Sequence, residues 1–193
     1  MNIDILVVLS YSYLLGSIPF GLLITKFFLN KDIRKIGSGN IGTTNVLRTG
    51  KKSLAIATLM FDVLKGYGSI IISIKYFNDL VFLSALICFI GHIFPVWLKF
   101  KGGKGVAVYL GIILALSYPL AFVFGISWII IALIFKYASV SSITGALAVL
   151  SYSFILNNYS LSFFLFIIFI IILFTHKENI RRLKYAKENK LKL

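Results

Sequence analysis

Residues 37–48 combine the residue types that hold phosphate groups in proteins. The stretch reads Gly-Ser-Gly-Asn-Ile-Gly-Thr-Thr-Asn-Val-Leu-Arg and lies between two long apolar runs. Its three glycines fall within six residues, which permits positive φ values and a close approach of the backbone to a ligand. Exposed N–H groups of such a backbone can form an anion cradle, and a guanidinium fork suits phosphate. The sequence therefore predicts a phosphate-containing ligand at Gly37, Gly39, Asn40, Gly42, Asn45 and Arg48, with further side-chain donors from Ser38, Thr43 and Thr44.

A second basic loop, Lys99–Gly105, reads Lys-Phe-Lys-Gly-Gly-Lys-Gly. It fails the G-x-x-x-x-G-K-[ST] pattern because Leu98 replaces the first glycine and Gly105 replaces the Ser or Thr. Residues 37–42 match G-x-G-x-x-G, but no βαβ unit surrounds them. The glycine-lysine loop still opens an apolar run, where amides and a helix N-terminus can bind an anion. Simple placement of lysines at the membrane surface is the alternative. The predicted binding residues here are Lys101, Gly102, Gly103 and Lys104.

Other polar residues lie inside or beside apolar runs. Asp62 and Lys65 are three residues apart, so on a helix they share a face and can pair. Charges within a membrane face the bundle interior or a functional cavity, so the pair either fixes helix packing or braces a site. The two histidines, His92 and His176, lack the neighbouring ligands that a metal site requires, and His92 is expected to be structural.

Near the end of the chain, His176 and Asn179 share one helical face. Ser139, Ser141 and Ser142 begin an apolar run, where serine is often only a helix cap. No Asp–His–Ser arrangement is available to activate a serine nucleophile. A covalent acyl-enzyme on one of these serines would lack the usual activating base but is not excluded by this, and His176 and Asn179 are predicted to reach a bound polar ligand from the tail.

The elements that must position these residues are membrane helices. The chain has 193 residues, is 59% hydrophobic and carries a net charge of +14, and its mean hydropathy is +0.96. Because the basic residues lie beside apolar runs, anionic lipid head groups explain the charge better than nucleic acid does. The single cysteine, Cys88, excludes an internal disulfide.

We expect an all-α integral membrane protein with seven transmembrane helices. The predicted spans are 3–29, 53–76, 79–98, a short span from 106, a span ending at 135, 139–157 and 160–175. The run 106–135 exceeds the about 20 residues that cross a bilayer, and Ser117-Tyr118-Pro119 divides it. The first run lacks the basic start of a signal peptide and is expected to be retained. Pro19, with Gly16 and Gly21, predicts a kink in it.

The distribution of lysine and arginine sets the expected orientation. The segments 26–52, 99–104, 136 and 176–193 hold 18 of the 20 basic residues. Since cytoplasmic loops are rich in lysine and arginine, the N-terminus is predicted outside and the C-terminus in the cytoplasm. Residues 1–193 are expected to form one polytopic membrane domain with a short basic tail at 176–193.

Taken together, three motifs resemble the bacterial membrane family of acyl-phosphate:glycerol-3-phosphate acyltransferases. The first is Gly37–Arg48 with Asp62–Gly66, and the second is Gly91–Pro95 with Phe100–Ala107. The third is His176–Leu183, followed by Glu188-Asn189-Lys190. The motifs cover nearly the whole chain in order.

The resemblance implies transfer of a fatty acyl group from acyl phosphate to the 1-hydroxyl of glycerol 3-phosphate. The products would be lysophosphatidate and inorganic phosphate, the first step of membrane phospholipid synthesis in the bacterial inner membrane. It also implies a partner enzyme that supplies acyl phosphate, contact with membrane lipids, and no cofactor, metal or nucleic acid. By resemblance, the residues around glycerol 3-phosphate are Ser38, Arg48, Lys104, Ser139, His176 and Asn179, with Ser139 preferred over Ser141.

Two other classes of function fit parts of the sequence. A transporter for a phosphorylated anion would explain the intramembrane charges and glycine-broken helices, but the polar motifs gather on one predicted side of the membrane. A scaffold that binds anionic lipids would explain the basic tail but not the Gly-Ser-Asn loop.

An acyl phosphate is already activated, so positioned Lys, Arg, Ser and Asn donors suffice for its reaction.

Overall fold

The computed structural model describes residues 3–191, and these residues form helices and loops with no β-strand. They divide into two compact units, at Leu116 and Ser117. Residues 1–2 and 192–193, the ends of the predicted membrane domain and tail, lie outside the described residues. The all-α prediction is confirmed for the described chain.

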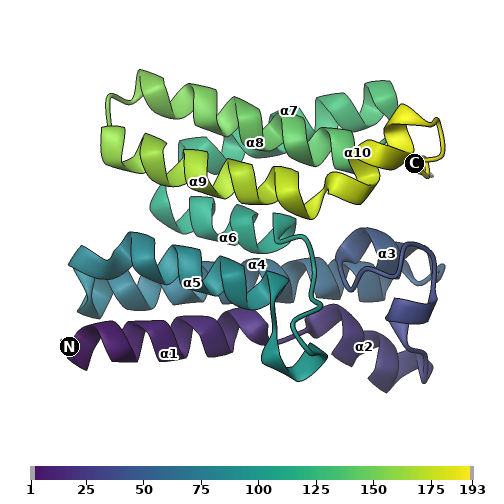
Figure 1. The fold of residues 1–193 in the computed structure, drawn as a ribbon, viewed down its shortest axis with the longest axis horizontal. Helices are drawn as coiled ribbons and strands as arrows, with labels where there is room; N and C mark the ends of the chain where they lie inside the picture. Colours follow the sequence, from purple (N-terminus) through teal and green to yellow (C-terminus); the bar gives the residue numbers. More distant parts are fainter. Residues whose placement is uncertain (1–2, 192–193) are drawn as a thin grey trace. The chain divides into compact units, whose positions relative to one another are not determined.

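Residues 3–116 contain six α-helices and three 3₁₀ turns. Their bounds are α1 Ile3–Ser17, α2 Phe20–Leu29, η1 Ile33–Lys35, α3 Thr43–Leu47, α4 Lys52–Tyr76, η2 Asn78–Leu80, α5 Val81–Ile93, η3 Val96–Leu98 and α6 Val106–Leu116. The long helix α4 packs against α1, α5 and α6, and α1 also packs along α5 (Figure 1). The expected break in the first apolar run is confirmed, because α1 ends at Ser17 and α2 begins after Pro19.

Glycines let these helices approach until their backbones touch. A Cβ on Gly16 of α1 would overlap the carbonyl of Cys88 in α5, and one on Gly111 of α6 would overlap the carbonyl of Val63 in α4. Small residues at membrane helix interfaces permit such close packing. The result is a rigid frame at the ends of α1, α4, α5 and α6, from which the two basic loops extend.

The loop between α2 and α4 is anchored by its own apolar side chains. Ile33, Ile41 and Val46 are buried together with Leu22 of α2, Ala55 of α4 and Leu98 of η3. Their burial holds the loop against the helix ends through the hydrophobic effect. The loop is therefore a folded element rather than a flexible link.

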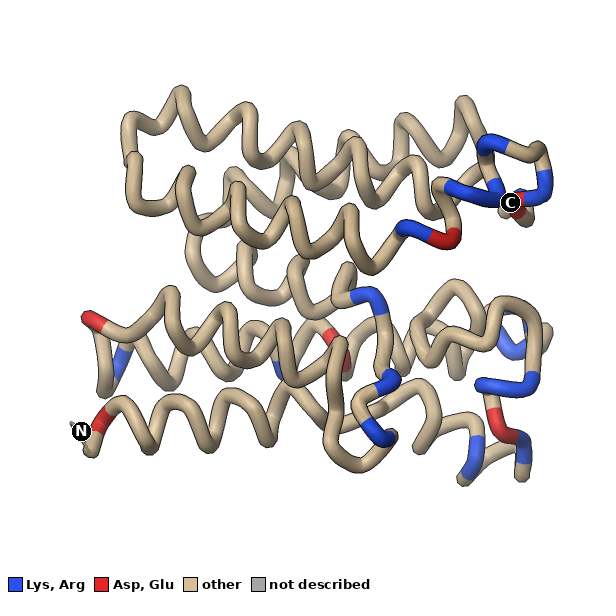
Figure 2. The backbone as a smooth tube through the Cα atoms, viewed as in Figure 1, with Lys and Arg blue, Asp and Glu red and all other residues tan. Residues whose placement is uncertain are grey.

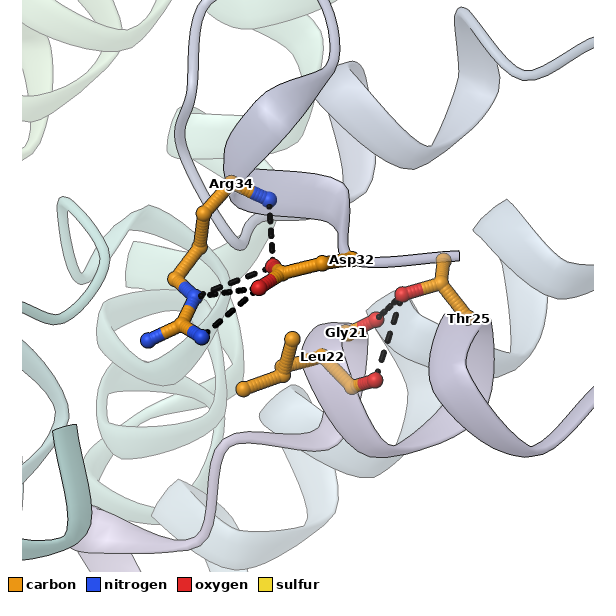
Figure 3. Close-up of polar contacts among 5 residues, drawn as sticks. All are labelled: Gly21, Leu22, Thr25, Asp32 and Arg34. Atoms are coloured by element: carbon orange, nitrogen blue, oxygen red, sulfur yellow. Dashed lines mark hydrogen bonds and ion pairs between the residues drawn. The ribbon is translucent and has the colours of Figure 1, made fainter. Parts of the chain in front are cut away.

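Local hydrogen bonds fix the entry to this loop (Figure 3). In α2 the Thr25 hydroxyl donates to the carbonyls of Gly21 and Leu22. Asp32 caps η1 by accepting from the backbone N–H of Arg34, and it also accepts from the guanidinium of that residue. These hydrogen bonds lower the pKa of Asp32 to about 2.

Residues 117–191 contain four helices: α7 Tyr118–Phe135, α8 Ala138–Ile155, α9 Tyr159–Thr175 and α10 Lys177–Lys184. Helix α8 packs against both α7 and α9. Helix α10 continues from α9 after a bend of 56°. The end of the described tail returns to the α7–α8 turn, where the N–H of Leu191 donates to the carbonyl of Lys136 at 2.6 Å.

The expected division of the run 106–135 is confirmed, since α6 ends at Leu116 and α7 begins at Tyr118 with Ser117 as N-cap. Five helical segments of the described chain are long and apolar enough to cross a membrane, or six if the bent pair α9–α10 counts as one. Helix α6, with 11 residues, is shorter than a usual span. The chain is therefore multi-pass by composition and helix length.

Within each unit most of the basic residues lie outside the long apolar helices, with Lys65 and Lys75 of α4 among the exceptions. Figure 2 shows that Lys and Arg of residues 3–116 lie mostly in the loops around α3 and before α6. Those of residues 117–191 gather in α10 and the tail after it (Figure 2). This is the arrangement expected where apolar helices face lipid and charged loops face water.

Candidate active site

The loop 37–48 is folded around the side chain of Asn45. This side chain is 2% exposed, and its amide nitrogen donates to the carbonyls of Ile33, Ile36 and Asn40 at 3.1, 2.9 and 2.8 Å. Its oxygen accepts from the N–H of Ser38 at 3.0 Å. All of the strong hydrogen bonds of Asn45 are thus made within the loop. The structure gives Asn45 a scaffolding place in the predicted phosphate loop.

The glycines of the loop adopt two different conformations. Gly37 and Gly39 have φ values of +56° and +72°, as the sequence predicts, whereas Gly42 has a φ of −81° and caps α3. The N–H of Gly39 donates to the carbonyl of Ile36, and the N–H of Gly42 donates to the side chain of Asn40. With Ser38 N–H also engaged, three amides of the predicted anion cradle are already used by the fold.

Side chains rather than these amides remain for a ligand. Ser38 and Arg48 are both exposed. The Ser38 hydroxyl makes no hydrogen bond to any described residue, and the Arg48 guanidinium makes only a long one, 3.4 Å, to Asn45. One hydroxyl and one cation are thus presented to solvent on a loop in which the N–H groups of Ser38, Gly39 and Gly42 already donate within the protein.

The second basic loop is fastened to the end of α5. The N–H of Gly102 donates to the carbonyl of Ile93 at 2.9 Å, and that of Gly103 donates to the carbonyl of His92 at 3.0 Å. Both amides are therefore occupied, as are those of Phe100 and Lys101. Lys101 is exposed and Lys104 is partly buried, with interactions of its own. The charges of this loop, more than its glycine amides, are what a bound anion would meet.

Behind the glycine-lysine loop lies a buried charged group. Lys65 and Asp62 of α4 form an ion pair at 2.8 Å, with side chains 2% and 3% exposed. The predicted pairing across one helical face is confirmed. The Lys65 ammonium also lies 2.9 Å from Nδ1 of His92 and donates to the carbonyl of Ile18 at 2.6 Å.

In residues 117–191 a second polar cluster forms around Glu188. Its Oε1 accepts from the Ser139 hydroxyl at 3.0 Å and from the Asn179 amide at 2.6 Å. Its Oε2 accepts from Nε of Arg182 at 2.7 Å. Two predicted site residues, Ser139 of α8 and Asn179 of α10, are thereby brought together by the tail.

This cluster is mostly enclosed and remains charged. Ser139 and Asn179 are 3% and 5% exposed, and the Glu188 side chain is 6% exposed. Burial opposes ionisation of Glu188, but the hydrogen bonds from Asn179, Arg182 and Ser139 outweigh it and lower its pKa. The carboxylate therefore stays ionised at neutral pH.

His176, at the end of α9, has one ring nitrogen whose hydrogen-bond role is defined by geometry. Nδ1 of His176 lies 2.8 Å from the carbonyl of Ile172. A carbonyl can only accept, so Nδ1 carries the hydrogen and Nε2 of the neutral ring is an acceptor. The ring is 2% exposed. His176 is thus oriented by its own helix.

The serines at the start of α8 differ in what they contact. Ser141 and Ser142 donate to the carbonyls of Tyr137 and Ala138, four residues earlier in the chain. Ser139 alone of the three reaches a side chain of the tail. Ser139, and not Ser141, is therefore the serine that hydrogen-bonds to the cluster around Glu188.

Sequence reasoning missed one participant in these clusters. Glu188 was part of a motif but had no predicted role, and its link to Ser139 spans 49 positions, so no local spacing could indicate it. His92 was expected to be structural, and it is buried against Lys65.

The whole chain is similar to known acyltransferases. Residues 6–186 match the family described as glycerol-3-phosphate acyltransferase. A protein named glycerol-3-phosphate acyltransferase from Pelagibacter ubique (strain HTCC1062) is 50% identical over 190 residues, 98% of this chain and 99% of that protein. One of the same name from Mesorhizobium japonicum is 44% identical, over 99% of this chain and 98% of that protein.

Solved structures agree with the sequence comparison. PlsY, an integral membrane glycerol 3-phosphate acyltransferase crystallised in its glycerol 3-phosphate form, has a TM-score of 0.92 and 35% identity, covering 97% of this chain and 96% of that one. Its lysophosphatidic acid form has a TM-score of 0.89 and 34% identity, covering 97% and 95%.

Proposed function

This chain belongs to the glycerol-3-phosphate acyltransferase family of integral membrane enzymes, and we propose that its acyl donor is an acyl phosphate. The reaction moves a fatty acyl group to the 1-hydroxyl of glycerol 3-phosphate and gives lysophosphatidate and inorganic phosphate. The observation that carries the proposal is the pair of ordered basic loops in residues 3–116. Both of its substrates are anions, and these loops present the cations Arg48, Lys101 and Lys104.

The chemistry needs no protein nucleophile. The substrate hydroxyl oxygen attacks the acyl carbonyl carbon, the bond from that carbon to the phosphate oxygen breaks, and phosphate leaves with the electron pair. The hydroxyl proton passes to a phosphate oxygen of the substrate in our proposal. The protein then has to hold anionic groups, orient a hydroxyl and stabilise developing negative charge.

We assign the cationic loops to phosphate. Arg48 offers a bidentate fork and Lys104 a point charge. Ser38, in the same loop as Arg48, adds a hydroxyl that makes no hydrogen bond to any described residue. Gly37, Gly39, Asn40, Gly42 and Asn45 shape that loop, and Gly102 and Gly103 shape the second. Their amides at Ser38, Gly39, Gly42, Gly102 and Gly103 already donate within the protein.

We assign the cluster of residues 117–191 to the neutral hydroxyl end of a substrate. Ser139 and Asn179 already share the ionised carboxylate of Glu188. A phosphate beside that carboxylate would meet like charge, whereas a hydroxyl would find donors and acceptors. His176, with Nε2 as acceptor, is suited to orient such a hydroxyl.

Activity of the purified protein tests this function. The protein in detergent is mixed with palmitoyl phosphate and glycerol 3-phosphate, without added metal, and phosphate release and lysophosphatidate formation are followed together. We expect equal amounts of both products. Phosphate without lysophosphatidate would indicate a hydrolase or another acceptor. No turnover by folded protein at several chain lengths would favour a transporter, which requires two compartments.

We also propose the finer membrane arrangement. Seven spans, with α6 as the short one, place the N-terminus outside and the C-terminus in the cytoplasm of a bacterial inner membrane, and the chain acts as one polytopic domain. The charge distribution supports this orientation. Single cysteines introduced at Asn2 and Lys187, in a Cys88→Ala background, should react with a membrane-impermeant thiol reagent from opposite sides.

A further inference from the structure

The three buried groups Asp62, Lys65 and His92 form one closed polar set in residues 3–116. They come from two helices, α4 and α5, and each residue is at most 5% exposed. The Lys65 ammonium lies against Asp62 at 2.8 Å, His92 Nδ1 at 2.9 Å and the Ile18 carbonyl at 2.6 Å. An ammonium has three hydrogens and no acceptor; it hydrogen-bonds to His92 and to Ile18 and forms an ion pair with Asp62, whose Oδ1 has no hydrogen-bond partner among the described residues.

The hydrogen bond from Lys65 defines the tautomer of the His92 ring. Because Lys65 can only donate, Nδ1 of His92 accepts, and the remaining hydrogen of the neutral ring lies on Nε2. Among residues 3–191, Nε2 has no hydrogen-bond partner. The ring is held firmly on one edge and is unbonded on the other.

The unbonded edge faces the glycine-lysine loop. A Cβ built on Gly103 would overlap Nε2 and would lie 2.9 and 3.0 Å from the two ring carbons beside it, closer than van der Waals contact. The backbone carbonyl of the same histidine accepts from the N–H of Gly103 at 3.0 Å. His92 therefore contacts Gly103 through both its ring and its backbone, one residue before Lys104.

Helix packing alone does not require such a set. An apolar group of similar volume often stabilises a protein core as well as a buried ion pair, or better, and charges inside a membrane are costly to place. Close glycine contacts already join α5 to α1 and α4 to α6. Through His92, the set instead contacts the glycine-lysine loop, which carries Lys104.

We propose that His92 is a positioning residue for glycerol 3-phosphate binding, locked by Lys65 and Asp62 and holding Gly103 so that Lys104 is correctly placed. This inference rests on the proposed function, which assigns Lys104 to phosphate. Lys65 fixes the ring through Nδ1, the ring fixes Gly103, and the backbone transmits that position to the next residue. His92 does not touch the reacting atoms in this account.

Variants at His92 separate its two edges. In His92→Asn the amide oxygen can replace Nδ1 as the acceptor for Lys65, so the buried ammonium keeps a partner, but no ring edge meets Gly103. We expect this variant to fold and its KM for glycerol 3-phosphate to rise about tenfold or more, with kcat at saturation changed much less. The Kd for glycerol 3-phosphate, from calorimetry in detergent, should rise in parallel. His92→Ala should raise both further.

Ser84→Ala is the matched control. Ser84 is also fully buried on α5 and bonds to Ser12 and Ser69, but it lies away from the loop. We expect it to lower the melting temperature and leave KM and Kd unchanged. If His92→Asn likewise lowers only the melting temperature, or lowers kcat with both KM and Kd unchanged, the positioning role is refuted.

A double variant tests the contact itself. In Gly103→Ala the new methyl overlaps the His92 ring, whereas in Gly103→Ala with His92→Ala the space is free. The two substitutions should therefore be non-additive, with a KM for the pair well below the product of the two separate effects. Multiplying effects would show that His92 and Gly103 are not coupled. If the wild-type protein shows no turnover but the His92 variants still raise the Kd for glycerol 3-phosphate as expected, the acyl-phosphate proposal is refuted and the positioning role is not.

Discussion

Replacement of Asn45 tests whether the first phosphate loop is held together as its hydrogen bonds indicate. The amide gives two N–H groups to three carbonyls and accepts one N–H at 3.0 Å. This corresponds to three hydrogen-bond equivalents in a side chain that is 2% exposed. At about 1 kcal/mol net for each, Asn45→Ala should destabilise the closed loop by about 3 kcal/mol.

That energy converts to a measurable change in loop opening. A loss of about 3 kcal/mol corresponds to roughly a hundredfold rise in the open population, since 1.4 kcal/mol is tenfold. Trypsin can report it, because the loop contains Arg34, Lys35 and Arg48. When opening is fast relative to cleavage, the cleavage rate follows the open population. We expect cleavage of the folded, detergent-solubilised variant to accelerate by roughly that factor, and acyl transfer to fall with it.

Asn45→Asp is the informative second variant. It keeps size and shape but replaces the two N–H groups with an acceptor facing three carbonyls, so it should open the loop at least as much as alanine does. Thr43→Val is the matched control in the same loop, because the Thr43 hydroxyl is buried and has no partner among the described residues. Unchanged trypsin protection in both Asn45 variants, together with a raised KM, would refute the scaffolding account and return Asn45 to direct substrate contact.

Three further predictions concern other residues. Arg48→Lys keeps the charge but loses the planar fork, so KM for a phosphate substrate should rise about tenfold, the effect of about 1.4 kcal/mol. The guanidinium of Arg34 pairs with Asp32, so the control Arg34→Lys should leave KM unchanged. Equal effects of the two substitutions on KM would remove the special role of Arg48. Ser139→Ala should reduce activity more than Ser141→Ala, whose hydroxyl bonds only within its own helix segment, and the reverse order in steady-state kinetics would overturn the choice of Ser139. Folding lowers the pKa of Glu188, so the stability that this carboxylate contributes is complete above the ordinary glutamic acid pKa and is lost as pH falls through the lowered value. The melting temperature of Glu188→Gln should therefore vary less than that of wild type between about pH 3 and pH 6. Identical profiles of melting temperature against pH would show that the carboxylate is not the cause.

Local sequence signals predicted the elements well. Pro19 separates α1 from α2 because proline removes a backbone donor, and Ser117 separates α6 from α7, whose first turn contains Pro119. The spacing of Asp62 and Lys65 sufficed for their pairing, since one helical turn brings them together. These features depend on neighbours in sequence, which is why they could be predicted.

The roles of individual donors could not be predicted in the same way. The sequence suggests amide cradles at both glycine-containing loops, yet Asn45 and the end of α5 already accept several of those N–H groups. Which amides remain free depends on how the chain turns back on itself. Glu188 presents the same difficulty, because its partners come from two separate helices, α8 and α10.

The use of amides by the fold changes how anion binding should be understood in this protein. Backbone cradles bind through many weak donors whose geometry is fixed by φ and ψ, whereas here the N–H groups of Ser38, Gly39, Gly42, Gly102 and Gly103 hold the loops closed. Binding then depends on a few charged side chains, whose strength falls with salt, and on how firmly their loops are held. Substitutions that loosen a loop should therefore weaken binding as much as removal of a cation does. A salt titration separates the two cases, because loosened-loop variants retain the salt dependence of KM and charge-deleted variants lose part of it.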